Sequence, residues 1–370
     1  MRFRWRERVV SQADVVARLQ SELNSLAEPL ARLLVLRGIS TLEEARLFFR
    51  GSLSDLHDPF LMAGMEAAAS RVAQAIQSRE PVLVFGDYDV DGVTSTALMV
   101  SFLREMEVPV SYHVPDRIEE GYGLNRGAID RAVERGARLL ISLDCGITAH
   151  DEAAYARERG VDLIVCDHHT PGESIPEAFA VLDPKRGDCG YPFKELSGCG
   201  VGFKLIQAVL DRMNLAPDLA YAYLDLVAIS AASDIVPVTG ENRVLMREGF
   251  RLIDEKPRPG LSALAARAEL ALSPCNSGRI VFGVGPRLNA AGRMSGASKA
   301  VELLLAPTID AAAPIAAELE RINSVRRDLD EAILGEAAAE AERAMPRSGL
   351  VLYRPDWHPG VIGIVASRIV

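Results

Sequence analysis

Three aspartates, Asp87, Asp89 and Asp91, fall within one short turn and are the clearest sign of chemistry in the chain. They follow the apolar run 81–85, which has the length and composition of a buried strand that ends at Gly86. Like charges this close repel one another unless a cation neutralises them. Clusters of oxygen ligands suit hard divalent ions such as Mg²⁺ or Mn²⁺. A solvated acidic turn is the alternative that this motif leaves open on its own.

Two further apolar runs end in side chains that can bind metals. The run 137–143 ends at Asp144, and the run 161–166 ends at Asp167-His168-His169. The segment between them is rich in alanine and charged residues and contains no proline, which is typical of a helix. In open α/β sheets, ligands bind beyond the carboxyl ends of parallel strands. We therefore expect the side chains at these strand ends to converge on one spot.

The predicted metal ligands are these strand-end residues together with Asp234, which stands where an apolar run gives way to a turn. The set is Asp87, Asp89, Asp91, Asp144, His168 and Asp234. Asp144 is a candidate carboxylate for bridging two ions, and His168 is a candidate ligand through its neutral imidazole. His169 could ligate a metal or contact a phosphate. Two divalent ions can activate a water, hold a phosphate and stabilise the leaving oxygen. The predicted catalytic residues for in-line phosphoester hydrolysis are Asp89, Asp91, Asp144, His168 and His169.

A polyanionic substrate also needs positive partners. Lys204 lies in a glycine-rich turn that opens a helix, where backbone N–H groups could hold a phosphate; a packing turn is the alternative. Arg287, Asn289 and Arg293 share a glycine-rich loop, and arginine forks suit phosphate. A charged surface loop is the competing interpretation of that segment.

The overall composition is that of a globular chain. Its 370 residues are 49% hydrophobic and 25% charged, enough for two or more domains. The net charge of −10 excludes a uniformly basic coat for nucleic acid but leaves room for a local basic groove. The five cysteines have no CxxC spacing, so we expect reduced, buried thiols in a cytoplasmic protein. No secretory signal or membrane span is expected.

The sequence predicts an α/β fold with a doubly wound, mostly parallel sheet. Helices are expected before it, from residue 11 to 50 and from 65 to 79, and a long connecting helix after it, from 309 to 345. A strand at 349–353 should begin a second α/β domain that continues past the end of this sequence. The predicted divisions are 1–75 (N-terminal helices), 76–237 (the sheet domain), 238–346 (helical extension and long helix) and 347–370 (start of the second domain).

Taken together, the motifs and their order resemble the RecJ family of single-strand-specific DNA exonucleases, within the DHH phosphoesterase superfamily. The resemblance covers the chain from about residue 50 to its end. The motifs are Gly86-Asp87-Tyr88-Asp89-Val90-Asp91-Gly92, Asp144-Cys145-Gly146, Asp167-His168-His169, Ser233-Asp234, Gly285-Pro286-Arg287-Leu288-Asn289-Ala290-Ala291-Gly292-Arg293 and His358-Pro359-Gly360-Val361-Ile362-Gly363-Ile364.

The resemblance implies a DHH domain with two Mn²⁺ or Mg²⁺ ions, joined by the long helix to a DHHA1 domain. The implied activity is processive 5′ to 3′ hydrolysis of single-stranded DNA to mononucleotides in recombination and repair. His169 would contact the phosphate, and Arg287, Asn289, Arg293 and His358 would hold the DNA backbone. Single-stranded DNA is the implied partner, and a helicase and a single-strand-binding protein are candidate partners.

This sequence departs from the pattern of its relatives at one ligand position. Other branches of the superfamily carry a histidine four residues before the first aspartate of the metal-binding Asp-x-Asp. Counted from Asp89, that position is Phe85, and Asp87 is the candidate replacement. RecJ proteins are also longer, with the rest of DHHA1 and usually an OB-fold that grips single strands.

Two other functions remain open at this point. The same metal centre could act on short oligonucleotides, cyclic dinucleotides or pyrophosphate, which relative rates on long strands and dinucleotides would separate. Alternatively, the chain could be a non-catalytic scaffold, which a folded protein without bound Mn²⁺ would favour. A dinucleotide-binding enzyme is disfavoured because acidic residues, not Gly-x-Gly-x-x-Gly, follow the first strand. A serine hydrolase is disfavoured because no Gly-x-Ser-x-Gly follows a strand.

Overall fold

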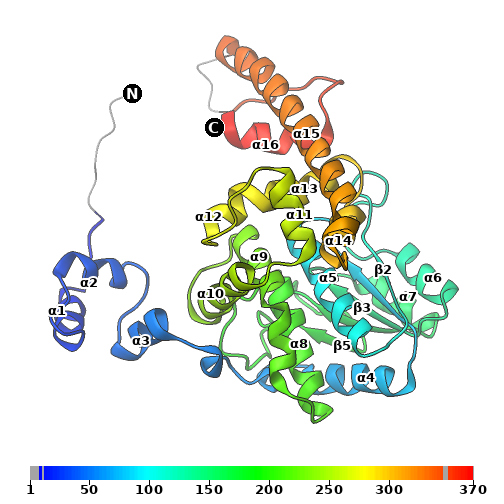
Figure 1. The fold of residues 1–370 in the computed structure, drawn as a ribbon, viewed down its shortest axis with the longest axis horizontal. Helices are drawn as coiled ribbons and strands as arrows, with labels where there is room; N and C mark the ends of the chain where they lie inside the picture. The colour runs from blue at the N-terminus through cyan, green and yellow to red at the C-terminus, as the bar shows by residue number, and fades with distance from the viewer. Residues whose placement is uncertain (1–7, 11, 345–348, 370) are drawn as a thin grey trace.

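A five-stranded sheet forms the centre of the main domain (Figure 1). The computed structural model describes residues 8–10, 12–344 and 349–369. The strands lie in the order β2-β1-β3-β4-β5, and every neighbouring pair is parallel. Their bounds are β1 (Val82–Gly86), β2 (Val110–His113), β3 (Leu139–Leu143), β4 (Asp162–Cys166) and β5 (Ala180–Leu182). The predicted parallel α/β sheet is confirmed, and β5 is an addition to the predicted strands.

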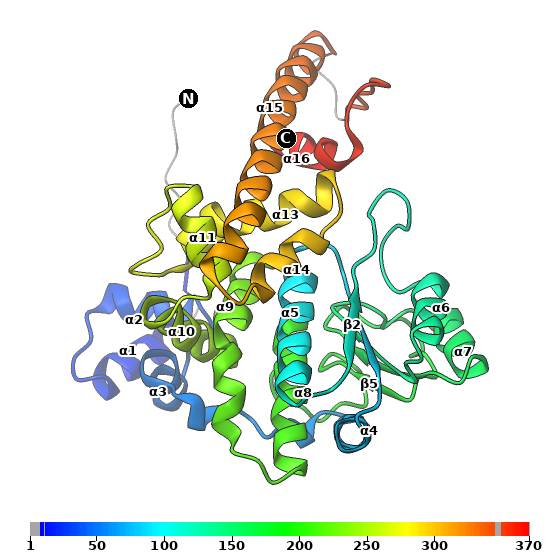
Figure 2. The ribbon, with the colours of Figure 1, turned by 45° about the vertical axis from the view of Figure 1, so that its right-hand side comes forward.

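Helices cover both faces of the sheet, as a doubly wound fold requires (Figure 2). Successive residues of a strand point to opposite faces. Val82 and Val84 of β1 accordingly belong to one buried cluster, and Leu83 and Phe85 belong to another. The helices that pack on the first face are α4 (Met65–Ser78), α5 (Val90–Glu105) and α8 (Gly198–Arg212). Those on the second face are α6 (Arg126–Glu134) and α7 (His150–Glu158).

The register of the sheet brings the carboxyl ends of its strands to one line. Gly86 at the end of β1 pairs with Leu143 at the end of β3, and Leu143 pairs with Cys166 at the end of β4. Cys166 in turn pairs with Leu182 at the end of β5. The residues that follow are all aspartates: Asp87, Asp144, Asp167 and Asp183. The convergence predicted from the strand-end pattern is therefore confirmed.

A group of helices follows the sheet and packs beside α5 and α8. Its members are η3 (Pro217–Tyr223), α9 (Leu224–Ser233), α10 (Gly240–Glu255), α11 (Pro259–Arg267), α12 (Ser277–Arg279), η4 (Ile280–Val284), α13 (Gly285–Met294) and α14 (Ser298–Leu305). The predicted glycine-rich loop around Arg287 is wrong, because residues 285–294 form the helix α13. Gly292 is needed within that helix, since a Cβ there would lie 2.3 Å from the carbonyl oxygen of Tyr88. That close approach seats α13 against the acidic turn.

The predicted long helix is confirmed as α15 (Ile309–Ala344), with Pro314 inside its first turns and the predicted last residue, Met345, outside the described residues. Its 36 residues span about 54 Å at 1.5 Å per residue. The far half of α15 packs against α16 (Pro359–Ile369) through a small apolar cluster that includes Ile333 and Val361. The strand predicted at 349–353 is wrong: these residues are irregular and pair with no described strand.

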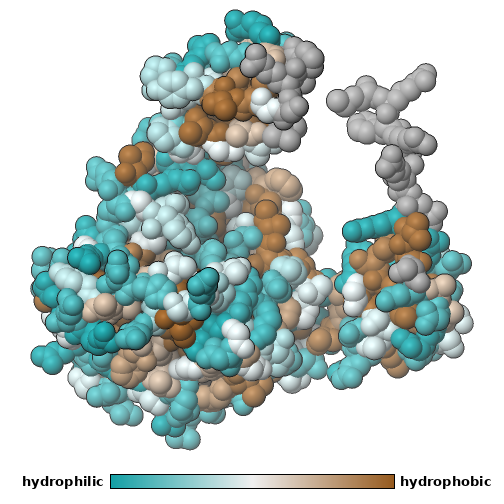
Figure 3. All heavy atoms as spheres, turned by 180° about the vertical axis from the view of Figure 1, so that it is seen from behind, coloured by the Kyte–Doolittle hydropathy of each residue, from teal (hydrophilic) through white to brown (hydrophobic). Residues whose placement is uncertain are grey.

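The N-terminal helices form a lobe set apart from the main body (Figures 1 and 3). Its helices are α1 (Ala13–Glu22), α2 (Glu28–Val35) and α3 (Leu42–Arg50). They share their own apolar cluster, which includes Leu19 and Ala31. Two short turns, η1 (Leu53–Asp55) and η2 (Pro59–Leu61), lead from the lobe to α4. The helical character expected of this region is confirmed, although residue 11 lies outside the described residues.

The domain boundaries proposed from the sequence fit these elements unevenly. The boundary at 75/76 falls within α4, whereas the one at 237/238 falls between α9 and α10. The boundary at 346/347 lies outside the described residues.

None of the five cysteines forms a disulfide, and four of them are buried. Across the described residues, we find no helix with the length and apolar character needed to cross a membrane.

Candidate metal centre

The acidic turn after β1 is folded tightly around its own backbone. Asp89 caps α5, because its Oδ1 accepts hydrogen bonds from the N–H groups of Asp91 (2.8 Å) and Gly92 (3.1 Å). A Cβ at position 92 would lie 2.2 Å from the carbonyl oxygen of Asp87, so only glycine fits there. The turn therefore holds the carboxylates of Asp87, Asp89 and Asp91 close together.

Asp91 is fixed by the first turn of α8. Its Oδ2 accepts from Gly198 N at 2.7 Å, and its Oδ1 accepts from Cys199 N at 2.8 Å and from Ser230 Oγ at 2.7 Å. The positive end of a helix stabilises a carboxylate in this position. These N–H groups are the ones expected from the sequence to cradle a phosphate. That expectation is wrong, because Asp91 already occupies them.

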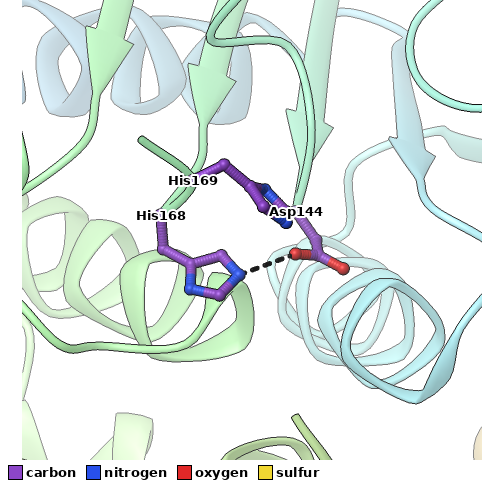
Figure 4. Close-up of side chains that lie close together, drawn as sticks. All are labelled: Asp144, His168 and His169. Carbon is purple, nitrogen blue, oxygen red and sulfur yellow. Dashed lines mark ion pairs between the residues drawn. The ribbon is translucent and has the colours of Figure 1, made fainter. Parts of the chain in front are cut away.

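Asp144 lies at the centre of the cluster and is almost completely buried. Its φ of +62° is a left-handed conformation, which aspartate tolerates better than most residues. Its Oδ1 lies 3.1 Å from Nε2 of His168 (Figure 4), yet neither atom has a hydrogen-bond partner. Close approach without a hydrogen bond is the arrangement expected of two ligands that face a shared cation.

The predicted ligands form neighbouring groups that meet at Asp144. Asp91, His168 and Asp234 make one group, in which His168 Nε2 lies 3.7 Å from Asp91 Oδ2 and 3.6 Å from Asp234 Oδ2. Asp87, Asp89 and Asp144 make a second, with one oxygen from each within 4.8 Å of the others. Asp144 also groups with His168 and His169. Every ligand predicted from the sequence is thus brought to one place, with Asp144 between the two groups.

The carboxylates of this cluster repel one another, and a bound cation would stabilise them. Burial, with repulsion from Asp89, raises the pKa of Asp87 to about 7, and burial, with repulsion from Asp91, raises the pKa of Asp234 to about 7. The same causes raise the pKa of Asp144 well above its usual range, while burial lowers the pKa of His168. Asp87 Oδ1 and both ring nitrogens of His168 are buried without hydrogen bonds. Unpartnered oxygens and neutral imidazole are a donor set that fits Mn²⁺ or Mg²⁺.

His169 is oriented differently from His168. Its Nδ1 lies 2.7 Å from Oδ1 of Asp167, and this hydrogen bond raises the pKa of His169. Burial opposes ionisation of Asp167, but the hydrogen bond from His169 and those from backbone N–H groups lower its pKa. A carboxylate can only accept, so Nδ1 is the donor, and Nε2 remains free for a substrate oxygen. His169 is therefore placed to donate to a phosphate.

An aromatic row extends from His169 along the surface. The ring of Tyr122 lies 6.3 Å from that of His169 and 6.2 Å from that of Tyr88. The guanidinium of Arg117 lies over the Tyr88 ring at 5.0 Å. Tyr122 is exposed. Tyr88 is half-buried. Aromatic rings that reach the surface beside cations can stack on nucleobases.

Two of the predicted phosphate-binding residues form ion pairs with glutamates of the protein. Lys204 is fully buried, with its Nζ 2.8 Å from Glu241 Oε1 and donating to the carbonyl oxygen of His57. Arg287 pairs with Glu320 and donates to the carbonyl oxygen of Gly283. Neither side chain offers a free charge to a phosphate, so the structure contradicts these two predictions. Both residues instead tie helices together.

Of the other predicted substrate contacts, Asn289 lies beside the acidic turn, and Arg293 and His358 meet at Gly360 in α16. Asn289 Oδ1 accepts from Val90 N at 3.1 Å. Arg293 donates to the carbonyl oxygen of Gly360, whose N–H donates to His358 Nδ1 at 3.0 Å. Burial, and then the neighbouring cations Arg117 and Arg326, lower the pKa of Arg293. Asn289, Arg293 and His358 therefore stay predictions.

Two residues near the cluster were not predicted, Asp183 and Arg326. Asp183 follows β5 and is fully buried, with Oδ1 accepting from Lys185 N and Oδ2 unpartnered; burial raises its pKa to about 7. The apolar run 180–182 before an aspartate repeats the strand-end pattern and could have indicated it. Arg326 of α15 carried no signal in the sequence, because it stands among many charged residues of a long helix.

The carboxyl pKa values predict that bound Mn²⁺ stabilises the protein more at high pH. In the folded, metal-free chain Asp87 and Asp234 have a pKa of about 7, against an ordinary value of 3.8. At pH values between these two numbers, the folded chain therefore binds more protons than the unfolded chain. Stability of the metal-free protein therefore falls as the pH rises from about 4 to about 7, and a cation reverses that loss. We expect the rise in melting temperature caused by Mn²⁺ to be larger at pH 8 than at pH 5.5. The control is matched ionic strength without Mn²⁺. An equal rise at both pH values would contradict this account.

The chain is similar to known proteins over most of its length. The DHH family, N-terminal domain, matches residues 81–231. The single-stranded-DNA-specific exonuclease RecJ of Bacillus subtilis is 40% identical over 358 residues, which cover 95% of this chain and 45% of that protein. The chain thus spans about half the length of that relative.

Two solved structures are similar to most of this chain. The crystal structure of exonuclease RecJ bound to manganese has a TM-score of 0.76 and 36% identity, and the match covers 83% of this chain and 77% of that one. RecJ of Thermus thermophilus in complex with Mn²⁺ has a TM-score of 0.82 and 32% identity, and the match covers 96% of this chain and 50% of that one.

Proposed function

The chain belongs to the RecJ family, and from this premise we propose that it is a metal-dependent exonuclease that hydrolyses single-stranded DNA from the 5′ end to mononucleotides. The observation that carries the proposal is the cluster of carboxylates around His168, in which Asp87 Oδ1, Asp144 Oδ1 and both ring nitrogens of His168 are buried without a hydrogen-bond partner among the described residues. The Bacillus subtilis relative is named as a single-stranded-DNA-specific exonuclease, and both of the solved RecJ structures described above hold manganese.

The proposed metal ligands divide between two positions. Asp91, His168 and Asp234 would hold one divalent ion, Asp87 and Asp89 would hold the other, and Asp144 would contact both. When bound, Mn²⁺ or Mg²⁺ would activate a water for in-line attack and neutralise the charge that develops on the phosphate. The intact ligand set argues against a non-catalytic scaffold.

The remaining side chains would bind and orient the strand. His169, held by Asp167, would donate from Nε2 to an oxygen of the reacting phosphate. Tyr88 and Tyr122 would stack on bases of the strand, and Arg117 beside them would attract its phosphates. Stacking needs bases that are not paired in a duplex, and this requirement supports a single-stranded substrate. A helicase and a single-strand-binding protein as partners, and a cytoplasmic location, stay predictions of the sequence.

Digestion of end-labelled DNA tests this function. The purified chain with Mn²⁺ should release labelled mononucleotide at once from a long single strand labelled at its 5′ end, and only late from a strand labelled at its 3′ end. The matching duplex should resist, and chelation of Mn²⁺ should stop the reaction. Absence of cleavage of the single strand would contradict the proposal. Faster turnover of dinucleotides than of the long strand would favour a phosphodiesterase of short oligonucleotides or cyclic dinucleotides instead.

A further inference from the structure

A polar pocket lies beside the metal centre, between the body of the protein and its long helix. It has a volume of about 180 Å³ and is lined by residues of α13, α15 and α16 and by Ser233 at the end of α9. Its polar lining consists of Ser233, Asn289, Arg293 and Arg326, and Ile364 closes one side. A water molecule occupies about 30 Å³ in the liquid, so the pocket has room for a phosphate group. Ser233 directly precedes the candidate ligand Asp234, which places the pocket next to the metal cluster.

Among the described residues, the arginines of the lining form no ion pair with a carboxylate. Nε of Arg326 is buried with no hydrogen-bond partner, and its Nη2 donates to the amide oxygen of Asn323 at 3.0 Å. Arg293 donates only to a backbone carbonyl among the described residues. Burial lowers the pKa of both arginines, and Arg326 contributes to the lowering at Arg293. The carboxylates of Asp330 and Asp89 oppose this lowering at Arg326 and Arg293 respectively, but they form no ion pair with these arginines among the described residues.

Other arginines of these helices form ion pairs with carboxylates. Arg287 of α13 pairs with Glu320 of α15, and Arg368 of α16 pairs with Asp330 of α15. Carboxylates of α15 thus pair with arginines of α13 and α16 and hold the three helices together. In the pocket, the hydroxyl oxygen of Ser233 is also buried and without a partner. Unpaired buried donors are destabilising, so their concentration around one cavity indicates that an anion completes them.

We propose that this pocket binds the backbone phosphate that follows the scissile phosphate on its 3′ side, with Arg326 as the main contact. The proposal rests on the proposed function and names a contact to the strand beyond the reacting group. The guanidinium forks of Arg326 and Arg293 match the oxygens of a phosphate, and Ser233 supplies a third donor. The pocket adjoins both ligand groups: Ser233 directly precedes Asp234, and the amide oxygen of Asn289 accepts from Val90 N in the acidic turn. A terminal nucleotide stacked on the aromatic row would direct the rest of the strand to the pocket.

Minimal substrates with a defined number of phosphates isolate this contact. A dinucleoside monophosphate has only the scissile phosphate, a trinucleoside diphosphate adds one on the 3′ side, and a 5′-phosphorylated dinucleotide adds one on the 5′ side. Arg326→Gln should leave kcat/KM on the first substrate within about 2-fold and lower it at least 10-fold on the second, mainly through KM, as expected of a lost charge-assisted hydrogen bond. Arg326→Lys should recover part of the loss.

The matched control is Arg327→Gln, because Arg327 is the next residue of α15 and is exposed. It should change none of the three reactions. Equal losses on all three substrates with Arg326→Gln would overturn the proposal, since Arg326 would then act on the reacting phosphate or on the fold. A loss confined to the 5′-phosphorylated dinucleotide would overturn it too, and so would no loss on any substrate.

Failure of the proposed function gives a different result. If the unaltered chain cleaves neither the long single strand nor any of these three substrates, the exonuclease function fails. In that case, or if it cleaves the long strand alone, the pocket is judged by calorimetry with inorganic phosphate. Arg326→Gln must then weaken phosphate binding at least 10-fold while Arg327→Gln retains it, as loss of a charge-assisted contact requires. Equal binding by both variants would reject the pocket as an anion site.

Discussion

Replacing Asp144 with asparagine should abolish metal-dependent hydrolysis while the fold survives. Asp144 lies between the two ligand groups, so its loss weakens the binding of both ions. A metal contributes several kcal/mol of transition-state stabilisation, which corresponds to a loss of roughly 10³-fold or more in kcat. Asparagine has nearly the same shape, and it removes one charge from a buried cluster whose carboxylates repel one another. The metal-free variant should therefore melt at a higher temperature than the unaltered chain, and calorimetry and nucleotide release measure the two effects.

Asp328→Asn is the control for this substitution, because Asp328 is exposed on α15, away from the cluster. It should leave both activity and melting temperature unchanged. Full activity in Asp144→Asn would contradict the assigned centre. A lower melting temperature in the metal-free variant would contradict the view that the cluster is held together against repulsion.

Gly198→Ala should lower activity about 100-fold, although this residue carries no side chain. A Cβ at position 198 would lie 2.7 Å from Cβ and 2.9 Å from Cα of Asp144, so the two backbones must move apart. The N–H of Gly198 also holds Asp91, so ligands of both groups shift together. A displacement of about 1 Å at reacting groups costs on the order of 10²-fold, and overpacking costs about 1–3 kcal/mol of stability. Nucleotide release and thermal unfolding measure these effects.

Gly200→Ala serves as the matched control, two residues further along α8. A Cβ at position 200 would meet only side-chain atoms of Leu196 and Ser197, at 3.4 Å or more. This variant should keep its activity and gain slightly in stability, since alanine favours helix over glycine. Equal losses in the two variants would show that α8 tolerates no substitution at its start, and would remove the specific role of the contact with Asp144.

The metal cluster could be predicted from the sequence because the residues that follow the strands of a parallel sheet lie side by side at one edge of it. Each ligand follows an apolar run, and the register aligns the ends of those runs, as the pairing of Gly86, Leu143 and Cys166 shows. Asp234 is the exception. It ends a helix, not a strand, and reaches the cluster because α9 packs against α5.

The roles of individual cations could not be predicted, because they depend on partners distant in the sequence. Lys204 and Arg287 have the sequence context of phosphate contacts, but Glu241 and Glu320 neutralise them in the folded chain. Arg293 lies six residues after Arg287, and among the described residues it donates to a backbone carbonyl and to no carboxylate. No local pattern separates these cases, since the difference arises from which helix packs against which.

Backbone predictions failed where tertiary contacts override local preference. The glycines around Arg287 suggested a loop, but Gly292 allows a helix to approach the Tyr88 carbonyl closely. The apolar residues at 349–353 suggested a strand, but a strand requires a neighbour for its backbone groups, and no described strand lies beside them.

Anomalous scattering from a crystal soaked in Mn²⁺ tests the central claim most directly. We predict two manganese peaks per chain: one bounded by Asp91, His168 and Asp234, one bounded by Asp87 and Asp89, and Asp144 in contact with both. Soaking the Asp144→Asn variant should weaken both peaks. Peaks elsewhere, or an Asp144 that contacts neither ion, would contradict the proposed two-metal centre.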